Sequence, residues 1–469
     1  MPYVVGSDLK PVFKKYMLIF ISLILTRPIY FVYPAVNGIV HADYPDMDMT
    51  ATPNPVGSGA RALGIGGAFI SVADDATAAS WNPSALLRLK RPEFSIVGSY
   101  YSGRNNYQTG GMEGDIEDHP LDIVHLNYLS AVFPCMFLQR NIVFSINYQH
   151  LYEFSLENQT AWREQDSMAL VDVSHNDYEY QRGSLYAISP ALALQIVPSF
   201  SIGLTFNFWD HDILDTGWEN LNIQDAQGID LGSEKISHSE VYERYVFSGF
   251  NMNLGFLFTS GYHMLWGAER RFRIGGVVKT PFKADIQHEK RRIFHEQYPG
   301  NPNLNTHQES TVQEDLTLKM PLSYGLGISV DFSDSFSTSL DIYRTHWDQY
   351  TLVYPSGDEV SPINKEMKSE ANIENTTQIR IGAEYLRFRA NTVIPVRMGF
   401  FYDPEPARGN VDDFYGVSMG SGIKYKNFAF DVAYQHRFGE KKNVESMLGE
   451  EISSHVTQHY LYTSMIFYF

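Results

Sequence analysis

The chain ends in the stretch His459-Tyr460-Leu461-Tyr462-Thr463-Ser464-Met465-Ile466-Phe467-Tyr468-Phe469, an alternating segment with an aromatic residue at its carboxyl end. A period of two places alternate side chains on opposite faces of a β-strand. About a dozen similar segments of roughly ten residues precede it, and short turns alternate with long polar connections between them. This pattern is typical of a transmembrane β-barrel, so an all-β membrane protein is predicted.

The composition agrees with a barrel and excludes other classes of protein. Aromatic residues make up 14% of the 469 residues, with 30 Tyr and 30 Phe, which suits the aromatic girdles of a barrel. After residue 42 no apolar run reaches about 18 residues, which argues against a helical membrane protein. A formal net charge of -18 argues against a nucleic-acid partner. The single cysteine, Cys135, rules out an intrachain disulfide, and no Cys/His cluster has metal-ligand spacing, so no metal and no cofactor are expected.

The first 42 residues are interpreted as a signal peptide. Two lysines precede the apolar run from Met17 to Leu25, and Val40-His41-Ala42 fits a small-x-small cleavage site. The run is too short for a membrane-spanning helix. The mature chain is therefore expected to begin near Asp43, and the start of translation, at Met1 or at Met17, stays open.

Fourteen antiparallel strands are predicted in a barrel that occupies residues 93–469. They lie near 93–101, 122–133, 140–152, 178–197, 199–214, 237–258, 269–289, 313–331, 336–349, 377–388, 392–402, 413–425, 427–438 and 457–469. Short connections follow the even-numbered strands and long polar ones follow most of the odd-numbered strands. A soluble sandwich has no reason for this asymmetry, whereas a barrel with short periplasmic turns and long outer loops has.

The alternation predicts which side chains face lipid and which face the lumen. Leu326 and Ile328 share one face of their strand, and Gly327 and Ser329 share the other. A lipid-facing arginine costs about 2–4 kcal/mol at the bilayer midplane, so strand charges are expected to point inward. The predicted lumen charge network consists of Asp341, Arg380, Glu384, Arg397 and Asp431. Its favoured role is to anchor a plug, and the alternative is that Arg380 or Arg397 meets a substrate carboxylate.

Residues 43–92 lack the period of two and are rich in Gly, Ala, Asn and Pro. A compact insert before a barrel is most simply placed inside it, as a hatch. Asp74 or Asp75 can cap a short helix, and Asn82 followed by Pro83 can begin another. The candidate hatch and gating residues are Gly64, Gly66, Gly67, Asp74, Asp75, Asn82 and Pro83. The candidate ligand contacts are Leu63, Phe69, Trp81, Arg380 and Arg397, although hatch side chains more often pack on the hatch itself.

Three stretches of the N-terminal segment form a recognisable set: Gly59-Ala60-Arg61-Ala62-Leu63-Gly64, Ala73-Asp74-Asp75-Ala76-Thr77 and Trp81-Asn82-Pro83. They resemble the hatch of the FadL-type outer-membrane transporters (OmpP1/FadL/TodX), which carry long-chain fatty acids or aromatic hydrocarbons. Further stretches resemble its barrel strands: Val278-Lys279-Thr280-Pro281-Phe282, Pro321-Leu322-Ser323-Tyr324-Gly325-Leu326-Gly327, Ser339-Leu340-Asp341-Ile342-Tyr343-Arg344-Thr345-His346-Trp347, and Ile394-Pro395-Val396-Arg397-Met398-Gly399-Phe400-Phe401-Tyr402-Asp403-Pro404. Where the family has Asn-Pro-Ala-Gly-Leu, this chain has Asn82-Pro83-Ser84-Ala85-Leu86, which leaves the substrate open.

The resemblance implies a passive outer-membrane channel for hydrophobic small molecules and no enzymatic activity. Ligand would be caught among outer loops near 215–236 and 290–312 and would pass a moving hatch, with release through the lumen or sideways both open. The expected partners are the hydrophobic ligand, outer-membrane lipid and the barrel-assembly machinery, which would recognise Phe469 on a monomer.

Two alternatives compete with uptake. The stretch from Gly59 to Phe69 is also similar to PorV-like barrels, which act in protein export, and that role predicts a partner protein and no ligand specificity. Gly416-Val417-Ser418-Met419-Gly420 matches the nucleophile-elbow pattern of hydrolases. That motif needs a strand–turn–helix context. Here it lies within a strand, so Ser418 is expected only to line the lumen.

Overall fold

The computed structural model describes residues 57–108, 114–117, 121–166, 170–230, 232–265, 268–445 and 451–469. The predicted signal peptide, 1–42, and the beginning of segment 43–92 lie outside the described residues. The helices are α2 Ala60–Gly64, α3 Ala78–Trp81, η1 Pro83–Arg88, α4 His211–Leu214, η2 Pro302–Leu304 and η3 Trp347–Gln349. Within the described ranges, no helix is long and apolar enough to cross a membrane.

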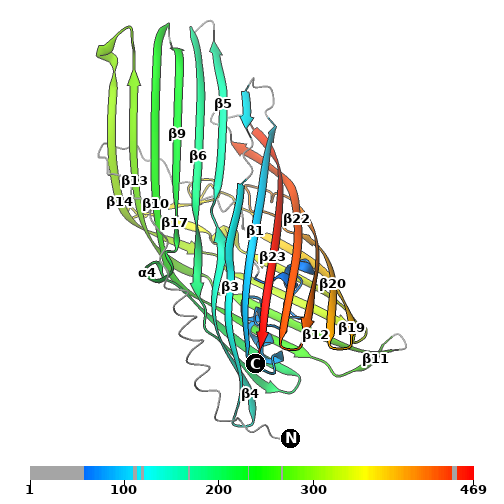
Figure 1. Ribbon diagram of the computed structural model, residues 1–469. Coiled ribbons are helices and arrows are strands. Elements are labelled where there is room, and N and C mark those ends of the chain that lie inside the picture. The colour runs from blue at the N-terminus through cyan, green and yellow to red at the C-terminus, as the bar shows by residue number, and fades with distance from the viewer. Residues whose placement is uncertain are drawn as a thin grey trace.

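In the part of the chain that the structure describes, the strands form one 23-stranded antiparallel sheet. Figure 1 shows how these strands curve into a barrel. They are β1 Glu93–Gln108, β2 Gly114–Glu117, β3 Leu121–Phe137, β4 Arg140–Glu153, β5 Leu156–Asp166, β6 Val171–Ile188, β7 Ala191–Val197, β8 Phe200–Trp209, β9 Gly217–Asp230, β10 Ser233–Thr259, β11 His263–Leu265, β12 Ala268–Lys279, β13 Phe282–Gln297, β14 Thr306–Met320, β15 Ser323–Asp331, β16 Phe336–Thr345, β17 Thr351–Val353, β18 Glu359–Val360, β19 Thr376–Arg389, β20 Thr392–Tyr402, β21 Phe414–Tyr425, β22 Phe428–Glu445 and β23 Glu451–Tyr468. β1 pairs with β3 on one side and with the last strand, β23, on the other, which closes the sheet into a barrel. The predicted closed antiparallel barrel is confirmed.

The predicted count of fourteen strands differs from that of the structure. The described residues form 23 strand segments, which include the short β2, β11, β17 and β18 and the strands of the upper extension. Prolines interrupt some predicted strands, because proline cannot donate to a ladder. Segment 178–197 is two strands, β6 and β7, separated at Pro190, and segment 313–331 is β14 and β15, separated at Pro321. The polar stretches 215–236 and 290–312, predicted as loops, are largely strand: β9 fills the first, and β13 and β14 form a long hairpin in the second.

The Thr280-Pro281 step shows how the wall survives such an interruption. It separates β12 from β13, both of which pair with β10. The Thr280 hydroxyl accepts a hydrogen bond from Met252 N at 3.0 Å, and Thr280 N donates to Met252 O at 2.9 Å. A side-chain oxygen thus satisfies a backbone donor that the interrupted ladder would otherwise leave unpaired.

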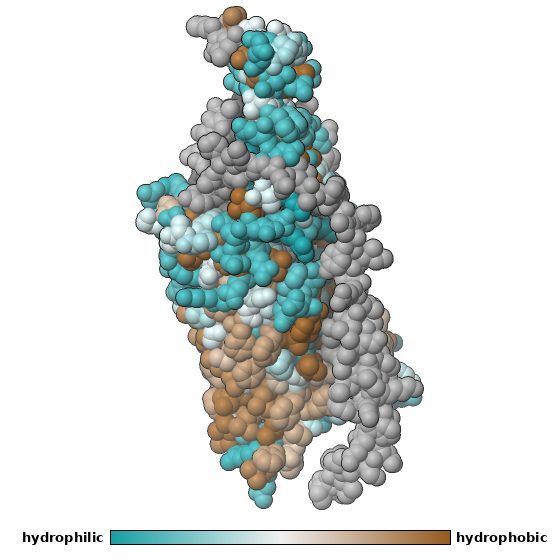
Figure 2. All heavy atoms as spheres, turned by 90° about the vertical axis from the view of Figure 1, so that its left-hand side faces the viewer, coloured by the Kyte–Doolittle hydropathy of each residue, from teal (hydrophilic) through white to brown (hydrophobic). Residues whose placement is uncertain are grey.

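The barrel has an apolar lower body and a polar upper extension. In Figure 1, β6, β9, β10, β13 and β14 continue well above the body, and in Figure 2 the body is brown and the extension teal. The predicted faces are confirmed, since Leu326 and Ile328 are 58% and 44% exposed whereas Ser329 is 1% exposed. An apolar outer band around a polar interior is the arrangement that a bilayer requires.

Tight turns join strands at the lower end of the barrel. Leu138 and Gln139, between β3 and β4, have φ values of 48° and 61°, as a two-residue type I′ turn requires. The carboxyl terminus lies at this same end (Figure 1), where Phe469 N donates to Pro92 O at 3.0 Å. The short connections and the end of the chain therefore share one side of the membrane.

Residues 57–92 pack against the inside of the barrel wall. Helix α2 contacts β20 to β23, and η1 contacts β4, β7, β8 and β10, on other parts of the ring. Inward-facing glycines permit this close approach: a Cβ on Gly399 would lie 2.2 Å from Gly66 N, and one on Gly203 would lie 2.3 Å from Ser84 N. Glycines in the wall thus allow close backbone contact near both ends of the segment.

The substitution Leu326→Arg tests the position of the apolar band. We expect it to lower the free energy of unfolding in bilayers by about 2–4 kcal/mol, because the charge would enter hydrocarbon. Ile229→Arg is the matched control, since Ile229 is also exposed but lies in the upper extension. Urea titration of the folded barrel in lipid vesicles measures both, and equal losses would contradict the band.

Candidate functional site

A buried ionic network joins segment 57–92 to strands β19, β20 and β22. Arg61 holds Glu384 with two hydrogen bonds, of 3.0 Å and 2.9 Å. Arg397 donates to the same carboxylate at 2.7 Å and, through its other arm, to Asp431. Paired arms of this kind are among the stronger polar contacts in proteins, and a buried charge without a partner is costly. The predicted lumen charges are therefore used to attach the segment to the wall.

The other two predicted lumen charges also contact this segment. Arg380 donates to Gly66 O at 3.1 Å and pairs with Asp403 at 3.2 Å. The Asp341 carboxylate accepts a hydrogen bond from Ile70 N at 2.8 Å. The five residues thus do not form one continuous cluster. Glu384 and Asp431 meet at Arg397, and Arg380 and Asp341 contact the segment separately.

The two neighbouring acids of the segment have different environments. Burial opposes ionisation of Asp74, but the guanidinium groups of Arg61 and Arg88 outweigh it and hold the pKa of Asp74 well below its usual range. Burial raises the pKa of Asp75, whose carboxylate accepts hydrogen bonds from the Thr77 backbone at 2.9 Å and hydroxyl at 2.6 Å. Asp74 therefore belongs to the ionic network, and Asp75 shapes the turn before α3.

Asn82 connects the segment to the opposite wall. Its side-chain oxygen accepts from Ser84 N at 3.2 Å, which caps η1 as the Asn82-Pro83 pair predicted. Its amide donates to Ile70 O at 3.0 Å and to Phe256 O, in β10, at 2.9 Å. One side chain therefore organises both a turn within the segment and a contact with the barrel.

The glycine run makes a tight turn beside α2. Gly66 and Gly67 have φ values of 69° and 75°, a region that favours glycine. Ser418 Oγ donates to Gly64 O at 3.2 Å from within β21. Ser418 therefore lines the interior and contacts the segment, and its strand lacks the helix that a nucleophile elbow needs.

A large apolar cluster is formed along one part of the barrel wall, by β6, β8 to β10, β13, β14 and β17 and the residues that flank them. It consists of Phe154, Leu185, Ala187, Trp209, Trp218, Tyr245, Phe247, Ala284, Ile286, Leu316, Leu318, Met320, Trp347, Tyr350 and Leu352. Trp218 stacks between Phe154 and Tyr245, with ring centroids 4.4 Å and 4.7 Å away. The sequence analysis did not predict this cluster. Most of its members lie in segments that were predicted as strands, and only Phe154, Trp218, Tyr350 and Leu352 lie in stretches that were predicted as loops. The available signal was the alternation of Ala284 with Ile286 and of Leu316 with Leu318 on consecutive segments.

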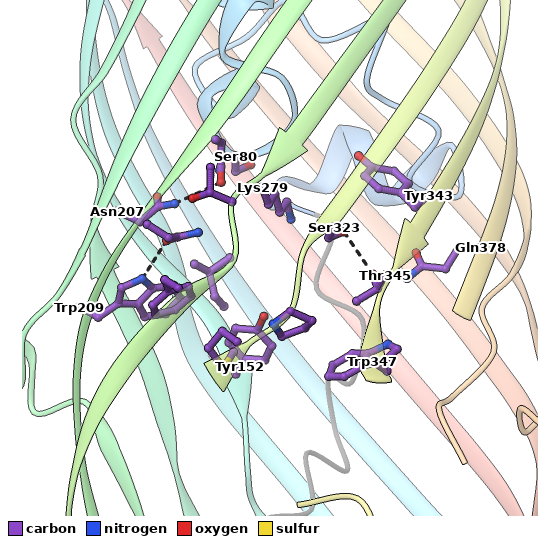
Figure 3. Close-up of a pocket in the computed structure, with 17 residues that line it drawn as sticks. Ser80, Tyr152, Asn207, Trp209, Lys279, Ser323, Tyr343, Thr345, Trp347 and Gln378 are labelled. Atoms are coloured by element: carbon purple, nitrogen blue, oxygen red, sulfur yellow. Dashed lines mark hydrogen bonds between the residues drawn. The ribbon is translucent and has the colours of Figure 1, made fainter. Parts of the chain in front are cut away.

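A cavity of about 60 Å³ lies beside this cluster, at the level where the strands are interrupted (Figure 3). Its wall combines aromatic and polar side chains, and several of the polar ones are already paired. Trp209 Nε1 donates to Asn251 Oδ1 at 3.0 Å, and Thr345 Oγ1 donates to Ser323 Oγ at 3.1 Å. Ser80 of the segment also contributes, so the cavity lies between the segment and the apolar cluster.

A second cavity, of about 110 Å³, contains three of the predicted ligand contacts, Leu63, Trp81 and Arg380. The other two lie elsewhere: Phe69 is fully buried against Trp81, with ring centroids 5.7 Å apart, and Arg397 is engaged by its two carboxylates. Ligand pockets usually measure about 300–1,000 Å³. Both cavities are smaller than this range.

The chain was compared with models of known protein families and with solved structures. A family model described as outer membrane protein transport protein (OMPP1/FadL/TodX) matches residues 55–464. A Pseudomonas aeruginosa FadL homologue superposes with a TM-score of 0.58 at 13% identity, over 90% of this chain and 100% of that one. The P. putida toluene transporter TodX gives 0.53 at 12% identity, over 89% and 99%, and the monoaromatic hydrocarbon channel CymD gives 0.52 at 15%, over 89% and 98%. These identities establish similarity of fold alone, and no curated protein sequence matches the chain.

The substitution Glu384→Gln tests the ionic network. We expect a loss of about 3 kcal/mol in the free energy of unfolding, because two buried arginines would lose their shared carboxylate. Asp172→Asn is the control, since its pair with Arg163 is exposed and such pairs contribute about 1 kcal/mol or less. Urea titration followed by tryptophan fluorescence compares the two variants. Similar losses of unfolding free energy would show that the buried network stabilises the fold no more than an exposed ion pair does.

Proposed function

The chain belongs to the OMPP1/FadL/TodX family of outer membrane transport proteins, and we propose that it is a channel for passive uptake of a hydrophobic small molecule. It is an outer-membrane β-barrel, as its family and fold indicate. We further propose that residues 1–42 are a signal peptide, 43–92 a hatch and 93–469 the barrel, which the assembly machinery inserts as a monomer by recognising Phe469. That residue is 55% exposed at the lower end of the sheet.

The apolar cluster inside the upper barrel is the observation that carries this proposal. Interiors of water-filled pores are polar. Here aromatic and aliphatic side chains from β6, β8, β9, β10, β13 and β14 meet inside the ring, above segment 57–92. A solute that crosses this cluster exchanges water for apolar contacts at about 25 cal/mol per Å². We therefore expect this part of the interior to favour the passage of hydrophobic solutes over that of ions and sugars.

The charge pairing favours a neutral ligand over a carboxylate. Lys279 lines the first cavity (Figure 3), whereas the sequence analysis named Arg380 and Arg397 as the cations that a substrate carboxylate would meet. Both are paired with acidic side chains: Arg380 with Asp403, and Arg397 with Glu384 and Asp431. A ligand carboxylate would have to displace one of these pairs. The proposed substrate class is therefore a neutral hydrocarbon, and the arginines are proposed to hold the hatch.

Gating is proposed to come from movement of the hatch. The segment lies beside both cavities, and each is too small for a solute unless groups around it move. Gly64, Gly66 and Gly67 supply a turn that can rearrange at low steric cost. In this account, Asp74 and Asp75 stiffen one end of the hatch, and Asn82 and Pro83 hold the other to β10.

Uptake measurements test the function. Cells that lack their own transporter would be compared with and without this chain for uptake of radiolabelled toluene and oleate. We expect toluene uptake to exceed oleate uptake, and the double variant Asn82→Ala, Pro83→Ala to lose it, because the hatch loses its contact with β10. A change in gel migration on heating shows that each variant has assembled into a folded barrel. An assembled barrel that takes up neither compound would contradict the proposal and favour the secretion-associated role.

The variant Leu316→Asn tests the apolar path. Leu316 is 2% exposed in β14 and lies in the apolar cluster. A buried amide without a partner costs about 1–3 kcal/mol, so we expect toluene uptake to fall roughly tenfold. Ile229→Asn, on the outside of the extension, is the control and should leave uptake unchanged. Unchanged uptake by Leu316→Asn would place the path elsewhere.

A further inference from the structure

Three potential metal ligands meet at the upper ends of β3 and β4. They are His125, His150 and Glu153, whose ligand atoms all lie within 4.8 Å of one another. Glu153 Oε2 is 2.6 Å from His125 Nε2 and 3.3 Å from His150 Nε2. The two imidazole rings have centroids 4.5 Å apart. Two imidazoles and a carboxylate form a common zinc-binding set.

A β-bulge brings His150 and Glu153 to the same face. Residues three apart on a regular strand point to opposite faces. In β4, however, His150 pairs with Tyr186 and Tyr152 pairs with the adjacent Leu185, so Leu151 is an extra residue. Bulges re-aim side chains and are common beside functional sites. This bulge explains why the spacing of the three residues in the sequence gave no sign of a metal site.

The carboxylate is held in place by two serines. Glu153 Oε1 accepts hydrogen bonds from Ser155 N, at 3.0 Å, and from the Ser155 hydroxyl. Ser184 Oγ donates to Oε2 at 2.7 Å from the neighbouring strand β6. Partners of this kind orient a ligating carboxylate and are part of most metal sites. Glu153 is 3% exposed, so its direction is set by the fold.

The imidazole nitrogens at this site lie close to the Glu153 carboxylate but make no hydrogen bond of good geometry. Nε2 of His125 and Nε2 of His150 are both buried, and within the described chain neither has a hydrogen-bond partner of good geometry. Asn127 Oδ1, which lines the same cavity, is also buried without one. The His150 side chain is 7% exposed. Buried polar atoms are nearly always satisfied, so three such atoms around one space point to a ligand there.

We propose that His125, His150 and Glu153 bind a divalent transition-metal ion of the zinc class. Bonds of about 2.1 Å to a tetrahedral ion place ligand atoms about 3.4 Å apart. The separation between His150 Nε2 and Glu153 Oε2 already fits, and His125 Nε2 needs to retreat by less than about 1 Å. The His125 side chain is 24% exposed, so a fourth position remains for water or a solute.

The position of the site gives the ion a structural role. His125, His150 and Glu153 line the second cavity together with Trp81 of the hatch segment and Arg437 of β22. An ion there would tie β3 to β4 at the upper edge of that cavity. It would also fix Leu151, the bulged residue, which lines both cavities. The ion would thus stiffen the wall facing the proposed hatch, whether or not the solute is a hydrocarbon.

Metal binding can be measured on the full chain, purified without a polyhistidine tag and stripped with chelator. Zinc content after dialysis is measured by mass spectrometry, affinity by calorimetry, and ligand geometry by the visible spectrum of the Co²⁺ form. We expect one tightly bound equivalent of Zn²⁺ and a tetrahedral Co²⁺ spectrum. His150→Ala and Glu153→Gln should each weaken binding by roughly tenfold or more, since a ligand is lost.

The double variant His295→Ala, His307→Ala is the matched control. It removes another close imidazole pair, with Nδ1 atoms 2.9 Å apart on an exposed hairpin. It should leave the tight equivalent intact. Less than half an equivalent of zinc in the parent chain, or loss of the equivalent in this control instead of in Glu153→Gln, would overturn the proposal. Glu153→Gln keeps the shape of the side chain, so it remains informative if His150→Ala fails to assemble.

Discussion

Closure of the sheet by pairing of β1 with β23 is the constraint on which the rest of this structure depends. Hydrocarbon offers no partner for a backbone N–H or C=O, so a membrane-spanning sheet cannot leave an edge open. The register runs without interruption from Glu93, paired with Tyr468, to Gln108, paired with Ser453. Closure puts every second side chain into an enclosed space. That space then has to be filled, and its charges have to be paired.

Segment 57–92 and the apolar cluster fill this space in two different ways. The segment is attached to the wall through Arg61, Arg380 and Asp341, through inward glycines that let backbone meet backbone, and through apolar side chains that it packs against the wall. The apolar cluster contains large aromatic side chains and lies beside the buried charges of Glu243 and His288. We propose that this packing favours hydrophobic solutes over ions, which connects it to the proposed transport.

The sequence predicted those features that depend on the alternation of residues along a strand or on neighbouring residues. Alternation identified the lipid face around Leu326, the inward charges and the capping role of Asn82, because each follows from a period of two or from a neighbouring residue. The strand count and the extension could not be read in this way. Prolines such as Pro190 interrupt strands that continue in space, and polar stretches such as 217–230 form sheet only because neighbouring strands pair with them. The grouping of His125 with Glu153 depends on a bulge that the sequence does not reveal.

Ion conductance of the purified protein in planar lipid bilayers tests the central claim most directly, because a barrel closed by its own segment should carry no steady current. We predict that inserted protein is electrically silent at moderate voltage, while vesicles made from the same preparation admit toluene. A stable, ohmic conductance of the kind an open porin shows would mean that the interior is a water-filled pore. That result would contradict both the proposed hatch and the apolar path.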